Sequence, residues 1–193
     1  MRLKWHGHSC FELTLDNGYV IVTDPFDDSV GYPSLRLKAD AVLTSHGHYD
    51  HNYLAAVAGE PVVVREPGEY ALGGAKRGPN LIFRVEADGV VLAHLGDLGH
   101  LPDTDAQRAA LSGLDAMLIP IGGYYTIDTP TAVRLIEAFK PRCAVAMHFR
   151  NRYCGFPVSD EGEFVRLTGA KRLPNAIELP EGLADGCAVM ELP

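Results

Sequence analysis

Three of the eight histidines and one carboxylate gather within six residues of this sequence. They follow a short apolar segment, residues 39–43, whose composition predicts a buried strand. Neutral imidazole nitrogens and an ionised carboxylate oxygen both suit a divalent ion such as zinc. A His-rich surface loop is the alternative, but alternating histidines followed by Asp-His seldom arise by chance at the end of a strand. We therefore expect a metal site formed by His46, His48, Asp50 and His51.

Two further apolar segments end in a residue that can bind a metal ion. Residues 91–95 lead into Asp97, and residues 145–147 lead into His148. Strand ends on one rim of a sandwich form a rigid platform on which loops can converge. Taken singly, Asp97 also fits a turn and His148 also fits a capped strand end. Six candidate ligands exceed the number that one tetrahedral zinc ion accepts, so their joint placement predicts two metal ions that share Asp97.

The elements that must hold these residues follow from apolar periodicity and turn residues. Strands are predicted over 10–15, 19–23, 42–44, 61–65, 81–86, 90–94, 116–120, 143–147 and 187–192. Helices are predicted over 52–58, 106–111, 131–140 and 161–167. Two blocks of strands, each followed by helices, predict an α/β fold arranged as a four-layer αββα sandwich. We expect a single domain, 1–193, built of two halves at about 1–80 and 81–193.

Composition and charge narrow the class of protein. Of the 193 residues, 47% are hydrophobic and 22% are charged, as in a soluble globular domain. The formal net charge of −8 argues against a general nucleic-acid binder, which normally carries a basic face. The four cysteines include no C-x-x-C pair, which favours a reducing compartment. The first residues lack an apolar signal region, and no apolar run approaches the roughly 20 residues of a membrane span. These features predict a cytoplasmic protein without a membrane segment.

The run Ser45–His51 resembles the His-x-His-x-Asp-His motif of the metallo-β-lactamase fold superfamily. Further phrases extend the resemblance over nearly the whole chain, and they are similar to the branch that includes ascorbate-6-phosphate lactonase-like hydrolases. These phrases occupy residues 5–9, 67–70, 94–100, 120–123 and 147–149. The motifs are specific for the fold and poorly specific for the substrate, because the fold hosts lactonases, phosphodiesterases, nucleases and other hydrolases.

The resemblance implies a role for each candidate ligand. His46 and His48 match the first metal site, Asp50, His51 and His148 match the second, and Asp97 matches the bridging carboxylate. Asp50 would also orient or deprotonate the water between the metals, so that a metal-bound hydroxide is the nucleophile. The implied cofactor is one or two Zn²⁺ ions per chain, with Mn²⁺ or Fe²⁺ as alternatives.

The sequence departs from the family pattern at one ligand. The family places another metal-binding histidine between the phrases at 67–70 and 78–80, and residues 71–77 contain none. An edge strand around residues 70–78 is therefore expected to be missing, and a homo-oligomer could compensate for the lost pairing. The metal site is then mononuclear or asymmetric, or another residue substitutes for the absent histidine.

Three histidines and one aspartate are candidates for supporting the site. His94 lies three residues before Asp97, so strand alternation places it on the opposite face and makes it a poor replacement. His100 could reach the site and His8 could support a ligand, although a hydrogen-bonded structural role is favoured for both. Asp24, at a strand end before a proline, resembles a residue that braces a ligand histidine, and a plain turn residue fits equally well.

The leading prediction is a metal-dependent hydrolase of a small anionic ester, lactone or phosphodiester. Lys76 and Arg77 could bind the phosphate or carboxylate of such a substrate, and a solvated turn explains them equally well. Tyr124 lines the pocket or serves packing. Nuclease activity is an alternative that the acidic charge disfavours. A catalytically weakened metal-binding sensor or scaffold is a second alternative, which the absent histidine supports.

Overall fold

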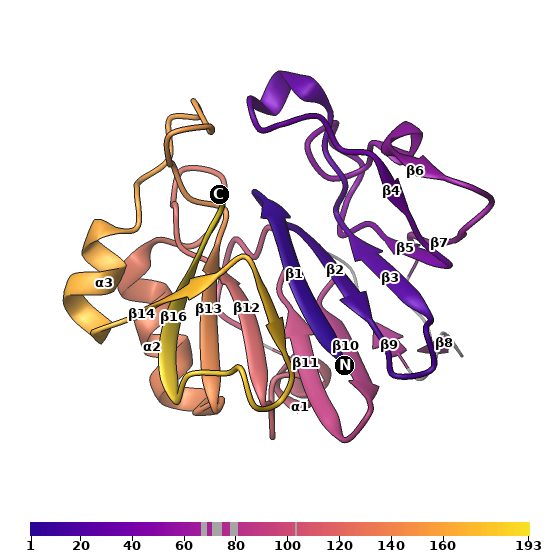
Figure 1. The fold of residues 1–193 in the computed structure, drawn as a ribbon. Helices are drawn as coiled ribbons and strands as arrows, with labels where there is room; N and C mark the ends of the chain where they lie inside the picture. Colours follow the sequence, from indigo (N-terminus) through magenta and orange to yellow (C-terminus); the bar gives the residue numbers. More distant parts are fainter. Residues whose placement is uncertain (67–68, 71–74, 78–80, 103) are drawn as a thin grey trace.

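Two β-sheets pack face to face in the computed structural model, with α-helices outside one of them (Figure 1). The structure describes residues 1–66, 69–70, 75–77, 81–102 and 104–193. Both sheets contribute fully buried side chains to one large apolar core, among them Leu3 and Phe11 from one sheet and Leu92 and Met117 from the other. The arrangement confirms the predicted α/β sandwich.

In the first sheet, the histidine-rich residues 46–51 come directly after one of the parallel strands. Among the described residues it has six strands, in the order β15-β1-β2-β3-β5-β7. Their bounds are β1 Arg2–Gly7, β2 Cys10–Thr14, β3 Val20–Thr23, β5 Ala41–Leu43, β7 Val62–Val64 and β15 Ala176–Glu178. β1, β2 and β3 are antiparallel, whereas β3, β5 and β7 run parallel. The parallel pairing brings the segments that follow β3 and β5 to the same edge of the sheet.

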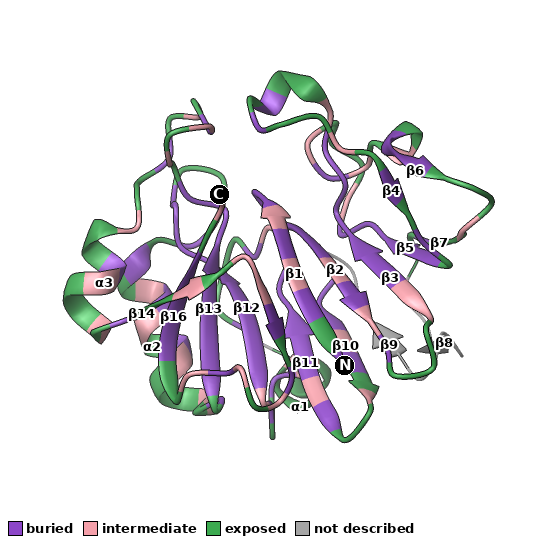
Figure 2. Cartoon of the chain, in the orientation of Figure 1, coloured by how far each residue is buried: buried purple, intermediate pink, exposed green. Residues whose placement is uncertain are grey.

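The second sheet contains the most deeply buried strands. Its described strands follow the order β14-β16-β13-β12-β11-β10-β9-β8. Their bounds are β8 Glu69–Tyr70, β9 Ala75–Arg77, β10 Phe83–Ala87, β11 Val90–His94, β12 Ala116–Pro120, β13 Cys143–Met147, β14 Lys171–Pro174 and β16 Gly186–Glu191. Every residue of the parallel pair β12 and β13 is buried (Figure 2). Continuous apolar strands of this kind need cover on both faces.

Three α-helices in the described part of the chain supply that cover on the outer face of the second sheet (Figure 1). They are α1 Asp105–Ala110, α2 Thr129–Phe139 and α3 Gly162–Thr168. In α2 the Asp128 side chain accepts a hydrogen bond from the Thr131 N–H at 3.0 Å, which satisfies a free donor of the first turn. Ala132 and Leu135 then lie buried on one stripe of the helix.

The outer face of the first sheet differs from the prediction. The helix expected over 52–58 is wrong: the chain forms only a 3₁₀ turn, η2 Leu54–Ala56, followed by β6 Val57–Ala58. β6 pairs with β4 Leu37–Lys38, and the Tyr53 N–H donates to the Pro25 carbonyl at 2.8 Å. These tertiary bonds replace helical ones. Another 3₁₀ turn, η1 Asp28–Val30, and the adjoining loop cover this face, where Phe26 and Tyr32 are buried.

Strands that were not predicted account for the remaining differences. They are the inner strand β1, the edge strands β14 and β15, and the short strands β4, β8 and β9. β14 has no buried residue that an apolar pattern could indicate. β8 and β9 join the second sheet and β15 joins the first, so the two sheets exchange strands across the predicted boundary near residue 80. Around residues 70–78, where an edge strand was expected to be missing, β8 and β9 lie at the edge of the second sheet, while residues 71–74 and 78 lie outside the described residues.

Candidate metal centre

One buried carboxylate, Asp24, anchors the loop that follows β5. It accepts hydrogen bonds from the Ser45 backbone N–H and the Ser45 hydroxyl, both at 2.6 Å, and from His51 Nδ1 at 2.9 Å. Asp24 and His51 are both fully buried. Because the carboxylate holds Nδ1, the ring of His51 is oriented with Nε2 turned away from Asp24 and available to a ligand. Asp24 therefore occupies the position of a residue that orients a ligand histidine.

Burial and charge act in opposite directions on this pair. Burial alone would raise the pKa of Asp24, but the neighbouring His51 and the hydrogen bonds from His51 and Ser45 lower it. Burial would lower the pKa of His51, but Asp24, Asp50 and Asp97 outweigh that effect and raise it to about 10. In the metal-free protein at neutral pH, His51 is therefore protonated. A metal ion that binds Nε2 must displace that proton.

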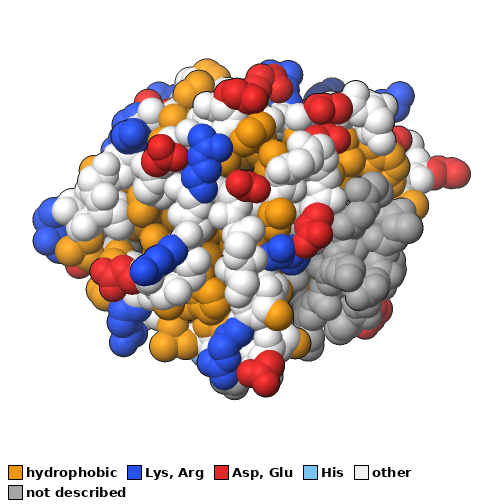
Figure 3. Space-filling model, turned by 90° about the horizontal axis from the view of Figure 1, so that it is seen from below, with side chains coloured by type: hydrophobic (Ala, Val, Ile, Leu, Met, Phe, Trp, Pro, Cys, Tyr) orange, Lys and Arg blue, Asp and Glu red, His pale blue; other side chains and the backbone are white. Residues whose placement is uncertain are grey.

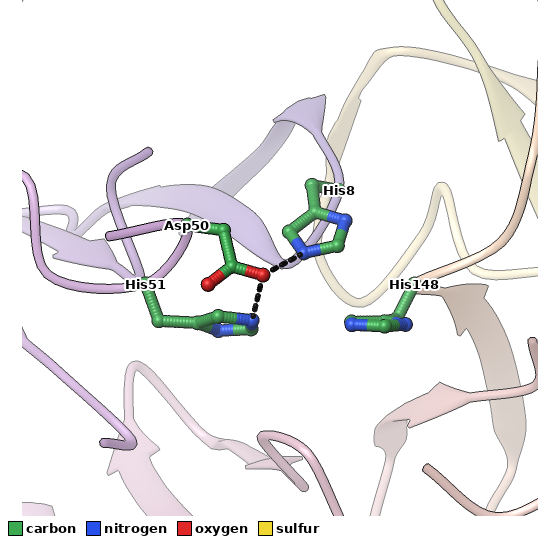
Figure 4. Close-up of side chains that lie close together, drawn as sticks. All are labelled: His8, Asp50, His51 and His148. Atoms are coloured by element: carbon green, nitrogen blue, oxygen red, sulfur yellow. Dashed lines mark ion pairs between the residues drawn. The ribbon is translucent and has the colours of Figure 1, made fainter. Parts of the chain in front are cut away.

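Four residues from three separate segments form what we call the buried cluster: His8, Asp50, His51 and His148. Each can place one ligand atom within 4.8 Å of the ligand atoms of the others. Asp50 Oδ2 lies 3.4 Å from His8 Nε2 and 3.5 Å from His51 Nε2, and the rings of His8 and His148 are 4.2 Å apart between centroids. Figure 4 shows the Asp50 carboxylate between the rings of His8 and His51, with His148 on the opposite side.

Asp97 connects the buried cluster to His46, and His46, His51 and Asp97 form a further group of close ligand atoms. Its Oδ1 lies 3.3 Å from His51 Nε2 and 3.4 Å from His148 Nε2, whereas its Oδ2 lies 3.8 Å from His46 Nε2. Burial would raise the pKa of Asp97, but the contact with His148 and the surrounding histidines hold it well below its usual range. An ionised carboxylate with one oxygen toward each group of histidines is suited to bridge two ions.

A second group of close ligand atoms, the outer set, comprises His46, His48 and Asp50. His48 is exposed, and the His46 ring is 22% exposed, in contrast to the fully buried rings of His8 and His51. All three members of the outer set come from the single loop after β5, where the Ser45 hydroxyl contacts His46 Nδ1 at 3.0 Å. The outer set therefore faces solvent, and Asp50 belongs to both groups.

Several buried polar atoms at this site have no hydrogen-bond partner among the described residues. They are both ring nitrogens of His8 and of His148, Nε2 of His51 and Oδ1 of Asp97. A buried donor or acceptor without a partner costs about 1–3 kcal/mol, so native proteins rarely leave several together. Imidazole nitrogens and carboxylate oxygens that converge in this way are the donors that a divalent ion such as zinc takes. The residues present thus fit a metal ion.

Three residues of the site adopt a left-handed backbone conformation at strand ends. His8 follows β1 with φ 49°, Asp24 follows β3 with φ 41°, and His148 follows β13 with φ 52°. Such a conformation is uncommon for residues other than glycine, and it costs of order 1–3 kcal/mol. The His148 N–H donates to the His8 carbonyl at 3.3 Å, so the two strand ends, one from each sheet, meet at the site.

Comparison with known proteins identifies the family. A model of the β-lactamase superfamily domain matches residues 2–76 and 71–148. A UPF0173 metal-dependent hydrolase of Thermoplasma acidophilum is 30% identical in an alignment that covers 77% of this chain and 83% of the relative. The chain belongs to the β-lactamase superfamily.

Two solved structures share the fold. A Thermotoga maritima protein assigned to its Zn-dependent hydrolases is 34% identical and superposes with a TM-score of 0.85, covering 100% of both chains. A metallo hydrolase of Ignicoccus hospitalis shares the fold at 23% identity, with a TM-score of 0.66 over 86% of this chain and 89% of that one. These similarities confirm the predicted superfamily. The finer resemblance to ascorbate-6-phosphate lactonase-like hydrolases stays a prediction.

Two histidines that were weighed as substitutes lie outside the groups of ligand atoms. His94 is fully buried, and its Nε2 donates to the Ser9 carbonyl at 2.9 Å while its Nδ1 accepts from the Gly96 N–H at 3.1 Å. Both of its nitrogens are thus satisfied. His100 is exposed, and its Nδ1 contacts the carbonyl of the next residue at 2.8 Å. Neither ring contributes an atom to the buried cluster or to the outer set.

The predicted substrate-binding residues have different positions. Tyr124 is 76% exposed and lines a shallow pocket together with His100, beside the start of α2. Lys76 and Arg77 belong to β9, and their side chains lie outside the described residues. Within the described segments, no helix is both long and apolar enough to span a membrane.

The surroundings of His8 differ from the expectation. A hydrogen-bonded structural role was favoured, yet neither ring nitrogen forms a hydrogen bond with a described residue. The available signal was the one that marked Asp97 and His148, a strand that ends in a ligand-type residue. It was overlooked because β1 was not predicted as a strand, although Leu3 and Trp5 alternate with less buried neighbours.

Proposed function

We propose that this chain is a metal-dependent hydrolase that acts on a small anionic ester, lactone or phosphodiester. The observation that carries the proposal is the convergence of unpaired imidazole and carboxylate groups on one rim of the sandwich, beside an outer set that faces solvent. The Thermoplasma acidophilum relative is named a metal-dependent hydrolase, and the Thermotoga maritima protein is assigned to the Zn-dependent hydrolases, which supports the same chemistry here.

On the buried side, a metal ion would be held by Asp50, His51 and His148, together with either His8 or Asp97. On the outer side, it would be held by His46, His48 and a shared carboxylate. When bound, it supplies Lewis acidity, which activates water near neutral pH and polarises the substrate. Zinc suits this mixed set of imidazoles and carboxylates, and manganese or iron are the alternatives.

Asp50 is the residue best placed to act on the attacking water. Its side chain is 14% exposed, so solvent reaches it, while Oδ2 contacts His8 and His51. Burial would raise the pKa of Asp50, but the imidazoles of His51 and His8, at 3.5 and 3.4 Å from its Oδ2, hold it well below its usual range. A carboxylate that is ionised at every working pH is a weak base, so its main contribution is to orient the water by accepting its hydrogen bond.

Aromatic side chains lead from His8 of the buried cluster to the surface. Tyr124 and Tyr125 are exposed, and the ring centroid of Tyr125 lies 6.4 Å from that of Phe156, which lies 5.5 Å from that of His8. On the face seen in Figure 3, Lys and Arg side chains are interspersed with Asp and Glu. The net charge of −8 argues against nucleic acid as the substrate.

A second candidate is a catalytically weak metal-binding protein that serves as a sensor or scaffold. It is favoured by the absence of any histidine in residues 71–77, where the superfamily pattern expects a ligand to the outer ion. The two candidates differ in turnover and agree in metal binding. An assay that follows both properties on the same sample therefore separates them.

The test is to reconstitute the metal-free protein with zinc, manganese or iron(II), then assay a p-nitrophenyl ester, a γ-lactone and bis(p-nitrophenyl) phosphate. We expect turnover of at least one class, and a loss of at least about 100-fold in kcat for Asp50→Asn. His6→Gln is the control, because His6 pairs with Glu12 at 3.1 Å, away from the ligand groups. Bound metal without turnover of any substrate would refute the hydrolase and support the second candidate.

A further inference from the structure

We propose that His8 is a direct metal ligand, so that the tightly bound ion of this protein is held by His8, Asp50, His51 and His148. The outer set then holds its ion weakly. The inference rests on the proposed function in one respect only, namely that the site binds a metal ion. Its basis is the position of His8, the unpaired state of its ring and the contrast between the buried cluster and the outer set.

The backbone of His8 is fixed from two sides. Its carbonyl accepts the indole N–H of Trp5 at 3.1 Å and the N–H of His148 at 3.3 Å. Gly7 precedes it with φ 114°, and a Cβ there would come within 2.3 Å of the Tyr32 ring. This packing holds the end of β1 in one place. It points the ring of His8 at the rings of His51 and His148, at centroid distances of 5.0 and 4.2 Å.

Nε2 of the His8 ring lies 3.4 Å from Asp50 Oδ2, but the ring makes none of the hydrogen bonds with described residues that a structural histidine would make. His8 is fully buried, and neither Nδ1 nor Nε2 forms a hydrogen bond with a described residue. His94 is buried to the same degree, and each of its ring nitrogens makes a hydrogen bond. The same chain thus satisfies one buried histidine and leaves another unpaired. In His8 the unpaired Nε2 lies among the ligand atoms of the buried cluster.

The donor set gives the two metal positions different affinities. The buried cluster offers three imidazoles and one carboxylate, which completes a four-coordinate zinc site from protein alone. It draws on the ends of β1 and β13 as well as on the loop after β5, so both sheets hold it in place. The outer set offers two imidazoles from one exposed loop, with Asp50 shared. We therefore expect one ion that survives dialysis and one that is lost.

The test measures zinc stoichiometry and affinity, by elemental analysis after dialysis and by competition with a chromophoric chelator. Wild-type protein should retain one ion. His8→Ala and His8→Gln should bind it at least 100-fold more weakly, beyond the 10–100-fold typical of residues that only orient a ligand. His48→Ala, in the outer set, and His94→Gln, the matched buried control, should retain the ion. A loss below 100-fold in both His8 variants would overturn the proposal.

X-ray absorption of the wild-type protein with one equivalent of zinc gives an answer that does not depend on a variant. Imidazole rings contribute characteristic outer-shell scattering, so three histidine ligands are expected, and two would contradict the proposed set of His8, His51 and His148. Failure here differs from failure of the proposed function. Absence of turnover refutes the hydrolase and leaves a His8-dependent ion intact, whereas turnover with an ion that is indifferent to His8 refutes only this inference.

Discussion

Replacing Asp24 with asparagine tests how the chain prepares His51 for metal binding. The carboxylate accepts three hydrogen bonds, two from Ser45 and one from His51 Nδ1. In Asp24→Asn the amide NH₂ takes the place of one oxygen and can donate to Nδ1, so that the neutral ring carries its proton on Nε2. That proton occupies the lone pair that a metal ion requires. We expect zinc affinity to fall about 10–100-fold.

The same change also weakens the metal-free fold. The rise of the His51 pKa from 6.5 to about 10 corresponds to about 5 kcal/mol at about 1.4 kcal/mol per unit. Because Asp50 and Asp97 share that effect, Asp24 accounts for part of it, and we expect a loss of about 3 kcal/mol, at the lower end of the range for breaking a buried pair. A raised histidine pKa stabilises the fold below pH 6.5, and the effect disappears as pH rises through 10.

Two measurements on one sample check this prediction. Chelator competition gives the zinc affinity, and thermal unfolding in a chelator at pH 6 should show a midpoint about 10 °C lower than wild type. Asp28→Asn is the control, because it makes the same chemical change at an exposed position of η1 nearby. A folded Asp24→Asn protein with unchanged zinc affinity would refute the argument from the tautomer. An unchanged midpoint would refute the argument from the buried charge pair.

Three further outcomes follow from the structure. Calorimetry of zinc binding at pH 8, in buffers of different ionisation enthalpy, should show about one proton released from His51. Zinc affinity should therefore fall as pH decreases below 10. A binding enthalpy that does not depend on the buffer would contradict this. Gly7→Ala should destabilise the fold by at least about 2 kcal/mol, because the new Cβ meets the Tyr32 ring. Gly18→Ala, also at positive φ but in open space, should cost only about 1 kcal/mol. Equal denaturation midpoints of the two variants would exclude the clash. Asp128→Ala should remove the N-cap of α2 and lower the free energy of unfolding by about 1 kcal/mol in urea titration, and an unchanged midpoint would show that the cap is dispensable.

The sequence predicted those parts of the fold that have a local pattern. β2 and β10 alternate in hydrophobicity before a turn, β3 and β11 follow that turn as apolar runs, and β12 and β13 are wholly apolar. β14 has no buried residue and owes its existence to pairing with β16, so no local pattern announces it. The 52–58 segment has helical composition, but the bonds from Tyr53 to Pro25 and from β6 to β4 determine its structure.

The same distinction between local sequence patterns and tertiary contacts applies to the site. His46, His48, Asp50 and His51 could be recognised because they are adjacent in sequence, and Asp97 and His148 because each follows an apolar strand. The hydrogen bonds of Asp24 and the unpaired ring of His8 could not be read from the sequence. Both depend on which atoms fold against them, from segments 21 to 140 residues away. Whether a buried histidine is satisfied, as His94 is, or unpaired, as His8 is, is a property of the tertiary structure alone.

The strand ends at the site link metal binding to the stability of the sandwich. His8, Asp24 and His148 hold left-handed conformations that cost of order 1–3 kcal/mol each, beside polar atoms that have no partner in the described chain. An ion present at about 1,000 times its dissociation constant stabilises the native state by about 4 kcal/mol, which is comparable with that cost. An ion at the buried cluster joins strand ends of both sheets, whereas an ion at the outer set takes its imidazoles from one loop. Loss of the first should therefore loosen the whole rim of the sandwich, and loss of the second should leave the rim intact.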